Sequence, residues 1–246
     1  MNVAGQMVKR HLFLMSSSGV HGYDYLMHAE HDMSTFLRKH KVERVLFIPY
    51  ARTNHKAYTS TVAKVLAKWN FDCDGIHTFP DPVQAVRDAQ AIFIGGGNTF
   101  LLLKTLYEYQ LVPAIREQVL RHGTPYMGSS AGTNVATRSI HTTNDMPIVY
   151  PPTFEALGLV PFNINPHYLA PVEGSTHLGE TRDDRILEFH EHHAAPVLGL
   201  PEGTTLLVEG DVATVVGLFP VRLFRQRQAW RQFQPESDVS FLLESP

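Results

Sequence analysis

Short apolar runs alternate with longer amphipathic stretches along most of this chain. Residues 11–15, 45–49 and 91–94 are apolar without the polar–apolar alternation of a half-exposed strand, so they predict strands buried on both faces. Between these runs, residues 25–40 and 57–69 carry apolar side chains at helical spacing. Such alternation is typical of a mostly parallel sheet flanked by helices. The pattern therefore predicts an α/β fold.

The second half of the chain adds a different pattern. A helix is predicted over residues 182–192 and a buried strand over 196–200. From 204 to 224, β-type runs interrupted at 209–211 predict a C-terminal antiparallel segment in the form of a hairpin. No internal repeat or linker marks a boundary, so we expect a single domain spanning residues 1–246.

Composition narrows the class of protein. Hydrophobic residues make up 43% of the chain and charged residues 18%, which is typical of a globular core. The net charge of −3 gives no electrostatic footprint for nucleic acid or an anionic membrane. No run reaches the roughly 20 apolar residues of a membrane helix, and residues 1–11 lack the apolar segment of a secretory signal. We expect a cytoplasmic protein with no nucleic-acid or membrane partner, and a homodimer is compatible with the sequence.

The single cysteine, Cys73, excludes an intramolecular disulfide and fits a reducing compartment. It lies in residues 73–79, which predict a strand closed by Pro80. We therefore interpret Cys73 as a packed side chain and not as a nucleophile.

The strongest chemical signal is Gly128-Ser129-Ser130-Ala131-Gly132, which fits Gly-x-Ser-x-Gly. An apolar strand precedes it and a helix is predicted from Ala131. In this motif a sharp strand-to-helix turn lifts the central serine hydroxyl out of the sheet edge, and the flanking glycines avoid collisions. The free N–H groups of the helix N-terminus could stabilise an oxyanion. Ser130 is therefore the candidate nucleophile.

A serine nucleophile needs a base and an acid that orients it. Among 14 histidines, His167 is the most constrained, because it follows an apolar run and Pro166. Two turn residues, Asp145 and Glu202, are candidates for the acid, and the residues alone do not choose between them. The expected site thus has one base and two alternative carboxylates.

The loop Gly95-Gly96-Gly97-Asn98 follows another predicted strand, so it should face the same crevice as Ser130. It lacks the lysine of a phosphate loop and does not fit Gly-x-Gly-x-x-Gly. A backbone amide donor to an oxyanion is its better functional interpretation, and Asn98 is placed to cap the following helix.

Two groups of ligand-type side chains are candidates for metal sites. Residues 190–193 read His-Glu-His-His and residues 28–31 read His-Ala-Glu-His, but neither fits His-Glu-x-x-His. We interpret both as solvated helix residues. The basic stretch 222–231 is interpreted as an exposed β-hairpin face and not as a nucleic-acid site.

The order of these segments resembles peptidase E, the α-aspartyl dipeptidase family of serine peptidases. The matching stretches run from about residue 45 to 205, and they are residues 47–49, 94–100, 128–134, 142–149, 164–167, 179–182 and 199–203. One departure is Ser129, which stands where the family is expected to carry an aromatic residue. The stretch after residue 208 matches poorly.

The resemblance implies an α/β fold like that of the class I glutamine amidotransferases, with no metal and no cofactor. It implies hydrolysis of Asp-X dipeptides, with Ser130 as nucleophile and His167 as general base. The amides of Gly97 and Ala131 become the oxyanion hole.

The remaining roles follow from the charges of the substrate. Either Asp145 or Glu202 orients the imidazole, and the other can pair with the substrate ammonium. Arg182, in a family-like segment, is the candidate for the substrate carboxylate, with Asn98 also assigned to substrate binding.

Three other functions compete with this one. A related serine peptidase could act on another acidic substrate, such as an aspartate-rich polymer. A catalytically inactive protein on the same scaffold could bind dipeptides. An ordinary α/β-hydrolase fits less well, because its catalytic histidine usually lies in the last loops of the chain. About eighty residues follow His167.

Overall fold

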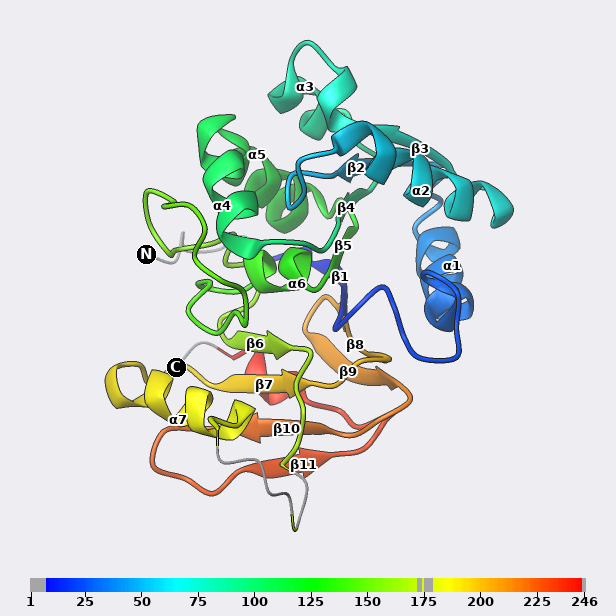
Figure 1. The fold of residues 1–246 in the computed structure, drawn as a ribbon. Coiled ribbons are helices and arrows are strands. Elements are labelled where there is room, and N and C mark those ends of the chain that lie inside the picture. The colour runs from blue at the N-terminus through cyan, green and yellow to red at the C-terminus, as the bar shows by residue number, and fades with distance from the viewer. Residues whose placement is uncertain (1–7, 172–173, 175–178, 245–246) are drawn as a thin grey trace.

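A seven-stranded sheet forms the centre of the molecule (Figure 1). The computed structural model describes residues 8–171, 174 and 179–244. The strand order is β3-β2-β4-β5-β1-β8-β9. The first five strands are mutually parallel, and β8 and β9 add an antiparallel edge beside β1. The strands are β1 (His11–Met15), β2 (Arg44–Ile48), β3 (Asp72–Gly75), β4 (Ile92–Ile94), β5 (Tyr126–Ser129), β8 (Thr204–Glu209) and β9 (Val212–Gly217).

The parallel strands are buried on both faces, as their apolar runs predict. In β1, Leu12 and Leu14 pack into one hydrophobic cluster, whereas Phe13 and Met15 pack into the other. Successive side chains of a strand point to opposite faces, so each cluster covers one face of the sheet. Burial on both faces explains the continuous apolar runs.

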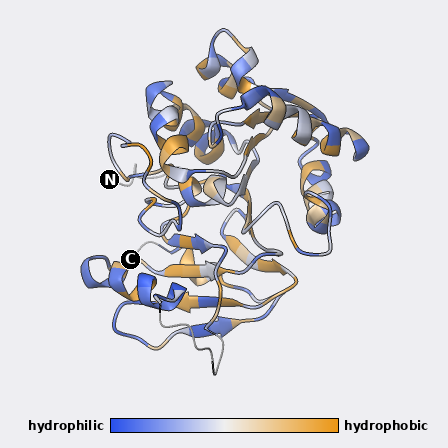
Figure 2. Cartoon of the chain, viewed as in Figure 1, coloured by the Kyte–Doolittle hydropathy of each residue, from blue (hydrophilic) through white to orange (hydrophobic). Residues whose placement is uncertain are grey.

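Helices cover both faces, with α1 and α2 on one side and α3 to α6 on the other (Figure 1). Hydrophilic and hydrophobic residues alternate along their ribbons in the hydropathy view (Figure 2). The α-helices are α1 (Glu30–Lys39), α2 (His55–Lys68), α3 (Pro82–Arg87), α4 (Thr99–Glu108), α5 (Leu111–Glu117), α6 (Ala131–Ala136) and α7 (Arg182–His192). Short turns of other helix types are η1 (Met27–Ala29), η2 (Ile76–Thr78), η3 (Gln118–His122) and η4 (Ser240–Leu242). In the described part of the chain, none of these helices is long and apolar enough to cross a bilayer.

A smaller four-stranded sheet, ordered β11-β10-β7-β6, lies beside the first one (Figure 1). Its strands are β6 (Asn163–Pro166), β7 (Val197–Leu200), β10 (Val221–Phe224) and β11 (Arg231–Phe233). Strands β6 and β7 are parallel, and the other pairs are antiparallel. Helix α7 packs on this sheet through Ile186 and Phe189. The α/β architecture with an antiparallel C-terminal part is confirmed.

Two details of the predicted elements are wrong. Residues 73–79 do not form one strand, because β3 ends at Gly75 and a 3-10 turn follows. The β-type runs after residue 204 do not form one hairpin either. Strands β8 and β9 do pair around Gly210, but β10 joins the second sheet through β7. Strand pairing depends on partners far away in the chain, which a local pattern does not specify.

Candidate active site

Ser130 occupies the turn between β5 and α6, with φ 53° and ψ −109°. Positive φ is uncommon for a residue with a side chain, and it is typical of the nucleophile turn. The turn is held by backbone contacts. The N–H of Ser130 donates to the carbonyl of Met15, and its carbonyl accepts from Thr133 and Asn134. These contacts fix the hydroxyl at the C-terminal edge of the parallel strands.

The two glycines of the motif are required by close backbone approaches. A Cβ atom on Gly128 would lie 2.7 Å from the carbonyl of Gly132. A Cβ atom on Gly132 would lie 2.0 Å from the carbonyl oxygen of Ile94, in the neighbouring strand. Both distances are shorter than real Cβ contacts, so a larger residue would push the turn away from the sheet.

Ser130, His167 and Glu202 form a continuous hydrogen-bonded chain. The Nε2 atom of His167 lies 2.9 Å from Oγ of Ser130, and its Nδ1 atom lies 2.6 Å from Oε1 of Glu202. The side chains of His167 and Glu202 are 38% and 48% exposed, so the chain of contacts is open to a substrate. An imidazole held between a hydroxyl and a carboxylate can accept the proton of the hydroxyl and is stabilised when it becomes charged.

Two neighbouring strand ends bring His167 and Glu202 together. His167 directly follows β6, Glu202 lies just beyond β7, and the last paired residues of the two strands are Pro166 and Leu200. His167 has φ 53°, and its N–H donates to Oγ of Ser16, which in turn donates to the carbonyl of Leu200. Ser16 follows β1, so it ties the base to the main sheet. Sequence reasoning missed Ser16, although its position after a buried strand placed it at this edge.

Asp145 lies in another set of contacts. Its Oδ2 atom accepts hydrogen bonds from the N–H of Thr99 at 2.8 Å and from Oγ1 of Thr99 at 2.6 Å. Oγ1 of Thr143 donates to the same oxygen at 3.2 Å. Thr99 is the first residue of α4, so the carboxylate sits at the positive end of that helix. Of the two candidate acids, the structure brings only Glu202 into contact with the imidazole.

The glycine loop after β4 lies directly against Ser130. A Cβ atom on Gly96 would be 3.1 Å from Cβ of Ser130. Gly97 has φ +144°, where side chains are strained, and a Cβ atom there would lie 2.3 Å from the carbonyl oxygen of Ala51. Within the described residues, the N–H groups of Gly97 and Ala131 have no hydrogen-bond acceptor. They are therefore free to donate to a ligand.

Both polar atoms of the Asn98 side-chain amide make hydrogen bonds within the protein. Its Oδ1 atom caps α4 by accepting from the N–H of Leu101, as predicted, and its Nδ2 atom donates to the carbonyl of Met146. These contacts join the glycine loop to the segment that carries Asp145. A direct contact of Asn98 with substrate stays a prediction.

Arg182 is the first residue of α7, after the capping residue Thr181. No hydrogen bond or ion pair joins it to Ser130, His167 or Glu202. The helix start is nevertheless tied to the base, because the next residue, Asp183, accepts a hydrogen bond from Tyr168. Partial burial, together with the nearby charge of Arg185, lowers the pKa of Arg182 from its ordinary value. Both effects disfavour the charged guanidinium, and an anionic ligand beside it would stabilise that charge.

The free cysteine and the metal-ligand side chains are separate from the contacts of Ser130, His167 and Glu202. Cys73 has a pKa raised to about 12 by burial and by the charge of Asp74, which disfavours the nucleophilic thiolate. Among the described residues, one group of three ligand-type side chains comes together, formed by His11, His40 and Glu209. This group contains none of the residues at 28–31 or 190–193, and both of its histidines pair with Glu209.

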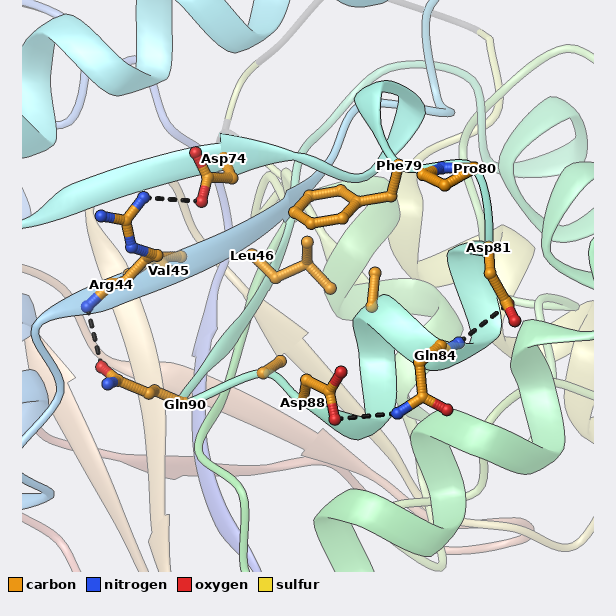
Figure 3. A pocket seen from close by; sticks show the side chains of 12 residues that line it. Arg44, Val45, Leu46, Asp74, Phe79, Pro80, Asp81, Gln84, Asp88 and Gln90 are labelled. Atoms are coloured by element: carbon orange, nitrogen blue, oxygen red, sulfur yellow. Dashed lines mark hydrogen bonds and ion pairs between the residues drawn. The ribbon is translucent and has the colours of Figure 1, made fainter.

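A pocket of about 350 Å³ opens at the start of β2 (Figure 3). Leu46 and Phe79 form part of its apolar lining, and Arg44, paired with Asp74, stands at its rim. Ser130 follows the C-terminal end of β5, whereas this pocket is at the N-terminal end of a parallel strand. The pocket therefore lies away from the hydroxyl and its base.

Comparisons with known proteins show which family this chain is similar to. Residues 12–216 match the model of a family described as peptidase family S51. The chain is 55% identical over 235 residues to a probable alpha-aspartyl dipeptidase of Drosophila melanogaster, covering 96% of this chain and 98% of that protein. It is 51% identical over 233 residues to peptidase E of Streptomyces coelicolor, covering 95% of each chain.

Two solved structures share the fold. A peptidase from an acI-B1 Actinobacterium superposes with a TM-score of 0.73 at 18% identity, covering 96% of this chain and 98% of that chain. A putative peptidase E protein from Listeria monocytogenes superposes with a TM-score of 0.65 at 24% identity, covering 85% and 98%. At these identities the likeness supports the fold alone.

Proposed function

The chain belongs to peptidase family S51, and from that premise we propose that it hydrolyses dipeptides whose first residue is aspartate, through an acyl-enzyme on Ser130. The observation that carries the proposal is the contact chain from Ser130 through His167 to Glu202. The names of the relatives from Drosophila melanogaster and Streptomyces coelicolor support the substrate class.

In the first half of the reaction, Oγ of Ser130 attacks the peptide carbonyl carbon while Nε2 of His167 takes its proton. Glu202 stabilises the resulting imidazolium. The negative charge that develops on the carbonyl oxygen is stabilised by the N–H groups of Gly97 and Ala131. The C–N bond then breaks, and His167 gives its proton to the departing amine. The second amino acid leaves, and aspartate remains as an ester on Ser130.

In the second half, water attacks the ester carbonyl and His167 takes a proton from that water. The same two N–H groups stabilise the second oxyanion. When the ester C–O bond breaks, His167 returns the proton to Oγ of Ser130 and free aspartate is released. One water molecule is consumed, and the hydroxyl and the imidazole return to their starting forms.

We assign the orientation of the imidazole to Glu202 and the support of the glycine loop and α4 to Asp145. Oδ2 of Asp145 already accepts hydrogen bonds from Thr99 and Thr143. Arg182 is proposed to pair with a carboxylate of the substrate, because a guanidinium binds a carboxylate through two parallel hydrogen bonds. An uncharged isostere would leave the arginine unpaired, which is a strong basis for discrimination.

The test is hydrolysis of Asp-Leu by the wild type and by Ser130→Ala. We expect the substitution to remove essentially all turnover and leave the fold intact. Ser129→Ala is a matched control, because Ser129 is adjacent and fully buried, and its hydroxyl has no hydrogen-bond partner among the described residues. It should keep activity within about tenfold of the wild type. Turnover retained by Ser130→Ala would refute the acyl-enzyme.

A substrate panel tests the specificity. Asp-Leu, Glu-Leu, isoaspartyl-leucine and poly-aspartate differ in the position of the carboxylate relative to the scissile bond. A preference for any substrate other than Asp-Leu would refute the substrate class while leaving the serine mechanism in place. We also propose a cytoplasmic location, supported by the single free cysteine.

A further inference from the structure

Arg52 lies at the C-terminal edge of the parallel strands, where Ser130 also lies, and it is next to the glycine loop 95–98. It follows the C-terminal end of β2, which pairs with β4, which in turn pairs with β5. Its Nε atom lies 3.3 Å from the carbonyl oxygen of Gly96. A Cβ atom on Gly96 would be 3.7 Å from Oγ of Ser130. Gly96 therefore lies between the guanidinium of Arg52 and the hydroxyl of Ser130 in space.

The side chain of Arg52 is exposed but not free to move at random. Its guanidinium carbon lies 4.2 Å from the centre of the Tyr58 ring, a favourable cation–π distance. Tyr58 is itself only 4% exposed and packs edge-on against Phe47. The arginine is therefore held between a fixed ring and a fixed carbonyl.

Its charge has no partner in the described part of the chain. No carboxylate lies within ion-pair distance of Arg52, and its two terminal amino groups have no hydrogen-bond acceptor there. Arg44, the first residue of β2, differs in this respect, because it pairs with both Asp72 and Asp74. An oriented and unpaired guanidinium beside a nucleophile is suited to bind a carboxylate.

We propose that Arg52 forms a second carboxylate-binding subsite, in addition to Arg182. The inference rests on the proposed function, because an Asp-X dipeptide carries two carboxylates, one on the aspartate side chain and one at the C-terminus. A single arginine can pair with only one of them. Arg52 and Arg182 come from different elements, α7 lying on the second sheet and Arg52 following β2 in the first. In this proposal each arginine pairs with a different carboxylate of the same substrate.

The competing explanation is that Arg52 only positions the glycine loop through Gly96. The two roles have different kinetic signatures. Loss of a positioning contact would lower turnover for every substrate alike. Loss of a subsite would lower kcat/KM only for substrates that carry the carboxylate bound there.

The experiment measures kcat and KM of the wild type and Arg52→Gln with Asp-Leu, Asn-Leu and Asp-Leu-amide. The inhibition constant against Asp-Leu replaces KM for any compound that is turned over too slowly. We expect Arg52→Gln to lower kcat/KM for Asp-Leu by about 10- to 100-fold, as for the loss of one charged hydrogen-bonded contact. One of the two neutral analogues should change less than about threefold. An unaffected Asn-Leu assigns Arg52 to the side chain, and an unaffected Asp-Leu-amide assigns it to the C-terminus.

Arg44→Gln is the matched control, because Arg44 is an exposed arginine at the opposite end of β2. It should leave all three substrates unchanged. The same measurements on Arg182→Gln should show the complementary preference. Equal losses for all three substrates in Arg52→Gln, or no loss at all, would overturn the subsite.

Failure of the proposed function is a separate outcome. A wild type that does not hydrolyse Asp-Leu would refute the function, and calorimetric binding of Asp-Leu would then test Arg52. Binding that Arg52→Gln weakens at least about tenfold would support the subsite. Unchanged binding, or none in the wild type, would refute it.

Discussion

The Nδ1 atom of His167 lies 2.6 Å from Oε1 of Glu202, a residue 35 positions later in the chain. The two residues stand at the ends of the parallel strands β6 and β7. This pairing orients the opposite ring nitrogen toward Ser130, at 2.9 Å. The positions of the hydroxyl, the ring and the carboxylate therefore depend on how the two sheets meet.

Glu202→Gln should lower kcat for Asp-Leu by about 10²- to 10⁴-fold with little change in KM, because the imidazolium loses its charged partner. Steady-state kinetics, with near-UV circular dichroism to verify packing, provide the measurement. A loss smaller than about threefold would contradict the assigned role of Glu202.

Asp145→Asn should act on stability more than on chemistry. The substitution removes the charge that accepts both hydrogen bonds of Thr99 at the start of α4. We expect the free energy of unfolding to fall by about 1–2 kcal/mol, measured in urea. The loss of kcat should be smaller than for Glu202→Gln. Equal losses of kcat would instead indicate that Asp145 supports the base.

The glycines near Ser130 should respond differently to alanine. Gly132→Ala should destabilise the protein by about 3 kcal/mol or more, because the added Cβ would meet a backbone oxygen of Ile94. Gly96→Ala should have a small effect on stability, yet lower kcat at least about tenfold by displacing Ser130. Gly19→Ala is the control, because nothing lies within 4 Å of its added Cβ. Equal unfolding free energies for the Gly132 and Gly19 variants would refute the crowding.

Glu209 should make stability depend on acidic pH. Burial would raise the pKa of its carboxyl, but hydrogen bonds from His40 and His11 outweigh burial and lower the pKa to about 2. A lowered pKa in the folded state stabilises the protein above the ordinary value of 4.5, and this contribution is lost as the pH falls toward 2. The wild type should exceed Glu209→Gln by on the order of 3 kcal/mol at pH 6.

Urea unfolding between pH 3 and pH 6 measures this contribution. The difference between wild type and Glu209→Gln should fall by more than half at the lower pH. Glu188→Gln, at an exposed glutamate of α7, should show no such dependence. A difference that stays constant across the range would rule out the lowered pKa.

Features set by neighbouring residues could be predicted from the sequence. Asn98 caps its helix as predicted, because a cap involves residues only three positions apart. Helix α7 has the predicted bounds, since Thr181 and Asp184 close a capping box at its start. The α/β class also followed from the apolar runs, and the resemblance to peptidase E is confirmed at the level of the family. The single domain, the homodimer and the role of each site residue stay predictions.

By itself, the sequence determined the starts of α4 and α7, the burial of the parallel strands and the sharp turn at Ser130, because each depends on residues close together in the chain. Only the tertiary structure decided that Glu202 and not Asp145 contacts His167, that β10 leaves the main sheet, and that Arg52 lies beside Gly96. Both acids occupy turns of similar local pattern. Their environments differ because strand pairing joins segments tens of residues apart, and that pairing is set by the packing of the whole core.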